Sequence, residues 1–445
     1  MLGMLGLILG LVLLMFLTLR GINIIIAAIL SSIVVAITGG LNLETALAGY
    51  YMDGFTNYFA SWFLIFLLGA IFGKIMHETG AAESIAQWIK RTLGAKRAVF
   101  AVVAAAAIMT YGGVSLFVVG FAVYPIAVSL FRAANLPHRF IPAALVFGSI
   151  SFTMTAPGSP EIQNLIPTEF FGTTPTAGGW VGVLMALLVM ITGGLLLSKF
   201  VQNAVKRGET FSLPGNRAKE EVSAGLAEKT EGEILVEEKT LPHIIFSILP
   251  LICVIVMLNI IAQFASSTAA ALISLTAGIV LACLTMYKFL AQFWNALAKG
   301  AQDALVAVAN TCAVVGFGSV AAQVSAFDSV VDGLVSLPGP PILGLAVAVT
   351  LICGITGSAS GGLGIALPIL APIYLAQGVD PGAMHRVATL ASGGLDSMPH
   401  NGYVVTTVRA ICGETHKRAY WPIFWLSVVI PTIAMLLAVV LYSIF

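Results

Sequence analysis

Residues 354–362 read GITGSASGG and interrupt an apolar stretch that runs over 342–377. The stretch is too short for two full membrane crossings, each of about 20 residues, together with a turn. Two short helical legs that meet at a glycine-rich tip fit the length better. The same pattern recurs over 98–131, where Tyr111-Gly112-Gly113 forms the interruption. We therefore predict two re-entrant hairpins, because non-helical backbone is tolerated at membrane depth only inside protein or around water.

Each predicted hairpin is followed by a helix that proline and glycine break. The first, over 140–171, contains APGSPE at 156–161, and the second, over 384–412, contains DSMPHNG at 396–402. Proline lacks the amide hydrogen that a helix needs, and its ring clashes with the preceding turn. A helix cannot continue through such a run, so both segments are predicted to be discontinuous.

The composition indicates that lipid is the main solvent of the chain. Of its 445 residues, 59% are hydrophobic and 9% are charged, whereas soluble domains carry about 25% charged residues. The net charge of +1 argues against nucleic acid as a partner. The sequence therefore predicts an all-α polytopic membrane protein in a lipid bilayer. Its candidate full spans are 1–19, 21–40, 58–76, 179–198, 242–262, 267–287, 303–326 and 419–444.

The two halves of the chain repeat the same order of elements. One constant shift along the sequence carries Pro137 onto Pro381, Met154 onto Met398 and Gly158 onto Gly402. In each half three spans precede a hairpin, a broken helix and a last span, and such internal repetition indicates duplicated structure. We predict a first membrane repeat over 1–198 and a second over 242–445. The polar segment 199–241 between them is expected to be a flexible linker.

Basic residues set the predicted orientation. The 74–97 loop carries five lysines and arginines, while its counterpart near 318–341 has none. Loops rich in these residues stay in the cytoplasm, so equivalent loops face opposite sides and the repeats are inverted. In a bacterial inner (plasma) membrane, this puts both termini in the periplasm and the 199–241 loop in the cytoplasm.

Inverted repeats with broken helices place a substrate site near the middle of the membrane, which predicts a transporter. The start of each half-helix leaves unpaired amides with a partial positive charge, and these bind anions. The alternative is that the small residues only permit close helix packing. The predicted substrate-binding residues are Gly112, Gly113, Ser115, Thr153, Thr155, Gly158, Ser159, Gln163, Asn164, Gly357, Ser358, Ser360, Gly361, Gly362, Ser397, His400 and Asn401.

Two acids, Glu161 and Asp396, lie in the predicted breaks. Ionisable groups at membrane depth are costly, so either is a candidate for proton or cation coupling. Asp396 could instead cap the half-helix that follows it. Arg386 is expected to anchor or pair at a membrane interface. We find no ATP-binding GxxxxGK[ST] motif, metal site or nucleophile–base pair, and we expect neither an enzyme nor a cofactor.

Several motifs resemble the gluconate permease (GntP) family of the ion transporter superfamily, and the similarity covers nearly the whole chain. They are GAAESIA at 80–86, LGAKRA at 93–98, YGGVSLF at 111–117, FTMT at 152–155, PEIQNLIP at 160–167 and DSMPHNG at 396–402. The residues of these motifs most resemble the branch of the family for 3-hydroxybutyrate-like acids.

The resemblance implies import of sugar acids and short hydroxy acids, generally with protons. It also implies a homodimer in which the hairpins and broken helices move as an elevator against a scaffold. It carries binding roles over to the tips and breaks named above. A site with few charged groups suits a small organic monoanion such as gluconate or 3-hydroxybutyrate. A Na⁺-coupled carboxylate symporter and a cation/proton antiporter remain the alternatives, since hydroxyls and carbonyls in the breaks could bind sodium.

Overall fold

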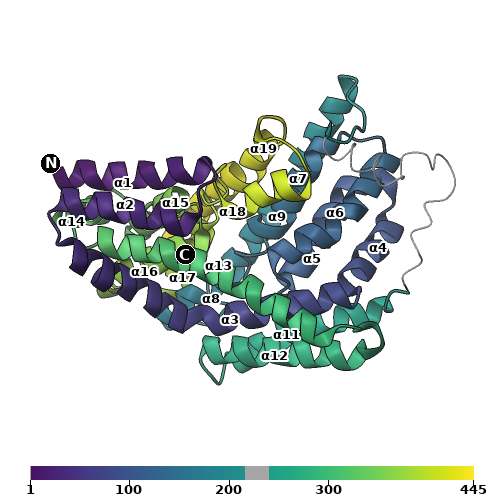
Figure 1. Ribbon diagram of the computed structural model, residues 1–445, viewed down its shortest axis with the longest axis horizontal. Helices are drawn as coiled ribbons and strands as arrows, with labels where there is room; N and C mark the ends of the chain where they lie inside the picture. Colours follow the sequence, from purple (N-terminus) through teal and green to yellow (C-terminus); the bar gives the residue numbers. More distant parts are fainter. Residues whose placement is uncertain (1, 216–239) are drawn as a thin grey trace.

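The computed structural model describes residues 2–215 and 240–445, and within these ranges every regular element is a helix (Figure 1). Eight of the described helices are long and apolar enough to cross a membrane. The prediction of an all-α polytopic membrane protein is confirmed. The greater part of the predicted linker, 216–239, lies outside the described residues.

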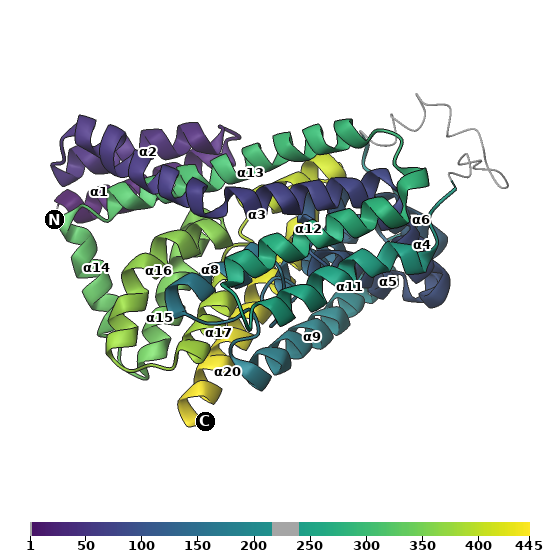
Figure 2. The same ribbon diagram turned by 90° about the horizontal axis from the view of Figure 1, so that it is seen from below.

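Two long helices form the frame of the molecule. They are α3 (Met52–Glu78), which continues a π-helical turn at Thr45–Tyr51, and α13 (Phe293–Ala321). A Cβ atom on Gly300 would lie 2.9 Å from the Cα atom of Ile71, so glycine lets the two backbones touch. Figure 2 shows the pair side by side along the molecule. The flanking helices are α1 (Leu2–Leu19), α2 (Ile24–Gly39), α11 (Ile244–Ile261) and α12 (Ser267–Thr285).

Helices pack in pairs where the two hairpins were predicted. The first pair is α5 (Ala98–Tyr111) and α6 (Leu116–Ala133), and the second is α15 (Pro341–Thr356) and α16 (Ala359–Ala376). The first legs have 14 and 16 residues. The second legs have 18 residues each and the composition of full spans, which differs from the short legs expected. The pairs lie at opposite ends of the frame (Figures 1 and 2).

Both discontinuous helices lose regular structure around their proline and glycine residues, over 152–161 and 393–401. The first consists of α7 (Ile141–Val146), a π-helical continuation to Ser151, and α8 (Ile162–Phe171). The second consists of α17 (Pro381–Ser392), α18 (Gly402–Val405) and a π-helical continuation to Ile411. The first half then closes with the long apolar helix α9 (Gly179–Lys206). The second half closes with one span, His416–Ile444, which consists of α19 (His416–Phe424), a π-helical turn at Trp425–Val429 and α20 (Ile430–Ile444).

Two further helices occupy segments that the apolar pattern predicts to be loops. They are α4 (Ala81–Leu93) and α14 (Ser325–Val335), and each precedes a hairpin. The chain turns by 102° between α4 and the start of α5. Helix α4 buries Ile85 and Ile89 on one face but carries Lys90 and Arg91 beside them. Charged residues on one side of each helix lower its mean hydropathy, so the search for apolar spans missed both.

The predicted linker begins inside a helix, because α9 continues to Lys206. Beyond this helix, Glu209 accepts hydrogen bonds of 2.7 and 2.8 Å from the Arg139 guanidinium. The Phe211 amide donates a hydrogen bond of 3.1 Å to Asn135 Oδ1. Residues 209–211 of the segment are therefore held against the loop that precedes α7.

Arg386, which is expected to anchor or pair at a membrane interface, is fully buried within the protein. Its guanidinium donates hydrogen bonds to the backbone carbonyl oxygens of Thr155, Pro175 and Ala177. These carbonyls belong to the first break and to the loop after α8, where helical partners are missing. A buried cation is tolerated when its donors are satisfied. Arg386 thus ties the second discontinuous helix to the first.

Candidate functional site

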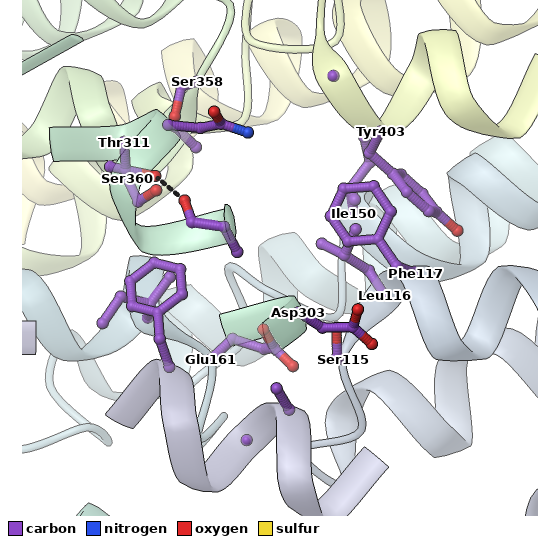
Figure 3. Close-up of a pocket in the computed structure, with 18 of the residues that line it drawn as sticks. Ser115, Leu116, Phe117, Ile150, Glu161, Asp303, Thr311, Ser358, Ser360 and Tyr403 are labelled. Atoms are coloured by element: carbon purple, nitrogen blue, oxygen red, sulfur yellow. Dashed lines mark hydrogen bonds between the residues drawn. The ribbon is translucent and has the colours of Figure 1, made fainter. Parts of the chain in front are cut away.

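The two hairpin tips and the two breaks meet around one cavity of about 690 Å³. Figure 3 shows Ser115, Glu161, Ser358 and Ser360 among the side chains around this space. Residues far apart in the sequence therefore line a common volume, as the positions of the tips and breaks predicted. The predicted site residues in its lining are Gly113, Ser115, Glu161, Gln163, Gly357, Ser358, Ser360, Asp396, His400 and Asn401.

Other predicted residues support the cavity from behind. The Thr153 hydroxyl donates to the Ser149 carbonyl at 2.6 Å. The Asn164 amide nitrogen donates to the carbonyls of Ser159 and Pro175, both at 2.9 Å. Because these donors bind backbone carbonyls in and near the first break, we assign the two residues no ligand contact. The predicted residues outside the lining are Gly112, Thr153, Thr155, Gly158, Ser159, Asn164, Gly361, Gly362 and Ser397.

Four helix starts face the cavity. The first residues of α6, α8, α16 and α18 all belong to its lining, namely Leu116, Ile162, Ala359 and Gly402. The first amides of a helix have no partner within the helix, and the aligned peptide dipoles give this end a partial positive charge. Their convergence creates a place for an anion without an arginine in contact with it.

Protein side chains occupy the helix starts of the second half. Ser358 Oγ accepts the Gly361 amide at 3.1 Å, and Asn401 Oδ1 accepts the Val404 amide at 2.9 Å. Asp396 accepts the Ser397 hydroxyl at 2.9 Å, and the Ala359 amide also donates to its carboxylate. Asp396 thus lies at the start of α16, whereas we had considered it as a cap for the half-helix after the break.

The helix starts of the first half carry no such caps. Neither Ser115 before α6 nor Glu161 before α8 makes a side-chain capping bond. Within 2–215 and 240–445, no donor reaches Oε1 of Gln163, although this residue is only 8% exposed. Within the same ranges, no hydrogen bond to the Glu161 carboxylate is found. A buried acceptor without a donor is costly, so this side of the cavity is chemically incomplete.

The frame helices add polar residues that the sequence analysis did not single out. Lys74 comes from α3, and Asp303, Asn310 and Thr311 come from α13. Lys74 Nζ lies 3.7 Å from Asp303 Oδ2. Both charges fall inside predicted apolar spans, and this was the signal that could have identified them. The part of the chain that the structure describes contains no group of three or more His, Cys, Asp or Glu residues that could hold a metal.

Comparisons with known proteins agree with this architecture. A family model described as GntP family permease matches residues 2–397. The uncharacterized transporter YxjC of Bacillus subtilis is 36% identical over 98% of this chain and 98% of its own length. The high-affinity gluconate transporter of Escherichia coli is 25% identical over 43% of this chain and 42% of its own length.

Among solved structures, the YdaH transporter of Alcanivorax borkumensis superposes with a TM-score of 0.54. The alignment covers 90% of this chain and 88% of that protein, with 18% sequence identity. Similarity at this level shows a shared fold and says nothing of substrate.

Proposed function

The chain belongs to the GntP permease family, and from this premise we propose that it imports a small organic monoanion by proton symport. The family consists of transporters, so the protein is not an enzyme. Gluconate and 3-hydroxybutyrate-like hydroxy acids are the proposed substrates. The observation that carries the proposal is the convergence of four helix starts and two carboxyl groups, Glu161 and Asp396, on one cavity.

The substrate carboxylate binds at the uncapped helix starts of the first half. The amides at the beginning of α6, beside the Ser115 hydroxyl, supply donors and a partial positive charge. Oε1 of Gln163 is buried and has no donor among the described residues, and a small rotation of this side chain, which lines the cavity, would let it accept a hydrogen bond from a substrate hydroxyl. This arrangement favours a hydroxy acid over a plain carboxylic acid, because only the former satisfies the buried amide oxygen.

Glu161 is the proposed proton carrier, and Asp396 has a structural role. Asp396 is already matched with donors from Ser397 and Ala359. Glu161 directly precedes α8, next to the proposed anion site, and repels a substrate carboxylate when it is ionised. A proton on Glu161 removes this repulsion, so proton and anion bind with positive coupling. Linkage makes the effect reciprocal, which is the requirement for symport.

Movement of the hairpins and discontinuous helices against the α3–α13 frame would carry the site across the membrane. The binding of Arg386 to carbonyls of the first break and of the loop after α8 favours their motion as one body. The placement of the hairpins at opposite ends of the frame supports inverted repeats (Figure 2). We accordingly propose an elevator mechanism in a homodimer, in a bacterial inner membrane, with the 74–97 segment in the cytoplasm.

Uptake into proteoliposomes tests this proposal. Gluconate, 3-hydroxybutyrate and lactate are offered under a pH gradient alone and under a sodium gradient alone. We expect accumulation of at least one hydroxy acid under the pH gradient. Accumulation only under the sodium gradient would support the Na⁺-coupled alternative, and sodium-driven proton flux without organic solute would support the antiporter.

The coupling role is tested separately with E161Q. We expect this variant to retain exchange of labelled for unlabelled substrate but to lose accumulation driven by the pH gradient. The matched control is E169Q, which lies in the same helix α8 with an exposed side chain. Unchanged accumulation in E161Q would exclude Glu161 as the proton carrier, and the same assay on D396N then tests Asp396.

A further inference from the structure

The lining of the cavity contains one lysine and no arginine among the residues that the structure describes. The lysine is Lys74, near the end of α3. The proposed binding region at the starts of α6 and α8 has partial charges only, and these act over a short distance. A full positive charge acts over a much longer range and raises the local concentration of anions in a cleft with low-dielectric walls.

Lys74 is held by an acid from the neighbouring frame helix. Its Nζ atom lies 3.7 Å from Oδ2 of Asp303 in α13, and the two side chains are 22% and 61% exposed. Gly300 and Ile71 lie about one helical turn before Asp303 and Lys74, and their close approach holds the two helices together there. Helices α3 and α13 run in opposite directions. Because helical side chains point back towards the start of their own helix, the side chains of Lys74 and Asp303 point towards each other.

We propose that Lys74 is a second anion site, at which the substrate carboxylate pauses between the solution and the deeper site. Asp303 pairs with Lys74 when substrate is absent, and the carboxylate of the substrate takes its place. The inference rests on the proposed function, because it requires an organic anion as substrate. The sequence motifs did not indicate this site, since Lys74 and Asp303 lie outside the tips and breaks.

The exchange of one carboxylate for another requires little energy. Exposed ion pairs are weak, because water solvates both partners well. The incoming carboxylate restores the ion pair that Lys74 loses from Asp303. Asp303, with most of its side chain exposed, is solvated when it is released. The pair therefore holds the lysine in place without blocking the site.

The site belongs to the frame and serves one face of the membrane. Lys74 begins the basic 74–97 segment; in the lining on α3 it is followed by His77 and preceded by the small residues Gly69 and Ala70. Small side chains leave room for a solute to pass along the frame. Under the proposed orientation, this passage connects the deeper site with the cytoplasm, so Lys74 receives the substrate as it leaves.

The test measures the apparent KM from each face separately, in vesicles of right-side-out and inside-out orientation. We expect K74Q to raise the KM about tenfold at one face and to leave it unchanged at the other. K74R keeps the charge and is expected to remain within about twofold of wild type. D303N frees Lys74 and is expected to lower the KM about threefold at the same face. The matched control is K299Q, an exposed lysine of α13 outside the lining.

The outcomes separate this inference from the proposed function. If wild-type protein transports an organic anion but K74Q has a normal KM at both faces, the second site is wrong and the function stands. A KM raised equally at both faces would place Lys74 in the deeper site and also overturn the inference. If wild-type protein transports no organic anion, the proposed function fails first. Folding of each variant is checked by its Tm in detergent.

Discussion

The two halves of the cavity consist of similar elements but differ in whether side chains cap their helix starts. In the second half, Ser358, Asn401 and Asp396 satisfy the amides where α16 and α18 begin. In the first half, the starts of α6 and α8 carry no side-chain caps, and Oε1 of Gln163 has no donor among the described residues. In the second half the helix starts are therefore satisfied by protein side chains, whereas in the first half they have no side-chain partner, as the proposed anion site requires.

The largest expected contrast lies at the tip glycines. Gly357 has φ +62°, and a Cβ there would lie 2.5 Å from a ring carbon of His400; Gly113 has φ +90°, and its nearest neighbour would be Pro160 at 3.3 Å. Alanine at either position carries backbone strain of about 1 kcal/mol. Only G357A also displaces a cavity side chain. We expect transport by G357A to fall at least about tenfold below that of G113A.

The control for both variants is G40A, because Gly40 has φ +71° with nothing within 4 Å of an added Cβ. This substitution is expected to leave transport near the wild-type rate, since it adds strain without a clash. Equal losses in G357A and G113A would show that backbone strain alone limits the tips, and the contrast between the halves would not extend to them.

The next contrast compares Asn401, which caps a helix, with Gln163, which is proposed to bind the substrate. Asn401 caps α18 and also donates a hydrogen bond of 3.1 Å to the Gly357 carbonyl. Loss of a cap and of one further hydrogen bond costs about 1 kcal/mol each, so N401A is expected to lower the Tm by about 2–5 °C. Q163A removes no protein hydrogen bond and is expected to leave the Tm unchanged while raising the KM about tenfold. Thermal unfolding and uptake kinetics measure the two effects.

Here the informative control is N401D, which keeps the capping oxygen but loses the amide donor to Gly357. Its Tm should lie between those of wild type and N401A. A lower Tm for Q163A than for N401A would reverse the assignment of structural and binding roles.

A smaller contrast concerns the serines before α6 and α16. S358A removes the cap on the Gly361 amide and should destabilise the protein by about 1 kcal/mol. Ser115 makes no capping bond, so S115A should change stability by less than about 0.5 kcal/mol and raise the KM a fewfold. Chemical unfolding of the two variants side by side measures the difference, and equal destabilisation would contradict it.

The smallest expected effect on stability concerns the loops that precede the two discontinuous helices. In the second half, Asp380 caps α17, whereas in the first half Arg139 binds Glu209. The hydrogen bonds from Arg139 lower the pKa of the Glu209 carboxyl from its ordinary value of 4.5. The stabilisation is therefore fully present above about pH 4.5 and is lost as the pH falls through the lower value of the folded state.

Replacement of Glu209 tests this sign. The side chain is 36% exposed, so E209Q should shift the Tm at pH 7 by only about 1 °C. The difference from wild type should shrink as the pH is lowered below 4.5. A difference that grows on acidification would show that the pair does not stabilise the folded state.

The membrane-spanning helices could be predicted from the sequence because the length of an apolar run can be read from it directly. The spans 1–19, 21–40, 242–262 and 267–287 lie close to α1, α2, α11 and α12. Helix α13 begins at Phe293, before the predicted 303, because its first turns mix aromatic with polar residues. The tips and breaks were located by glycine and proline, whose conformational limits do not depend on tertiary contacts.

The orientation of individual side chains could not be predicted. Gln163 lines the cavity, but its neighbour in α8, Asn164, points to carbonyls in and near the break, and Thr153 within the break binds Ser149. Composition locates a break, but the rotation of each residue within it depends on what packs around it. The frame residues Lys74 and Asp303 lie near the ends of predicted spans, where a charge is ordinary, so their position inside apolar segments did not mark them as cavity residues.

The buried guanidinium of Arg386 also constrains how the protein is made. The ribosome finishes the carbonyls of Thr155, Pro175 and Ala177 long before it reaches the arginine that they bind. At about 5–20 residues per second, this delay is roughly 10 to 40 seconds. Asn164 and the Gly158 amide can already bind the Pro175 carbonyl during that interval, but the carbonyls of Thr155 and Ala177 wait for Arg386. We therefore expect the first half to complete its packing only after most of the second half has been synthesised.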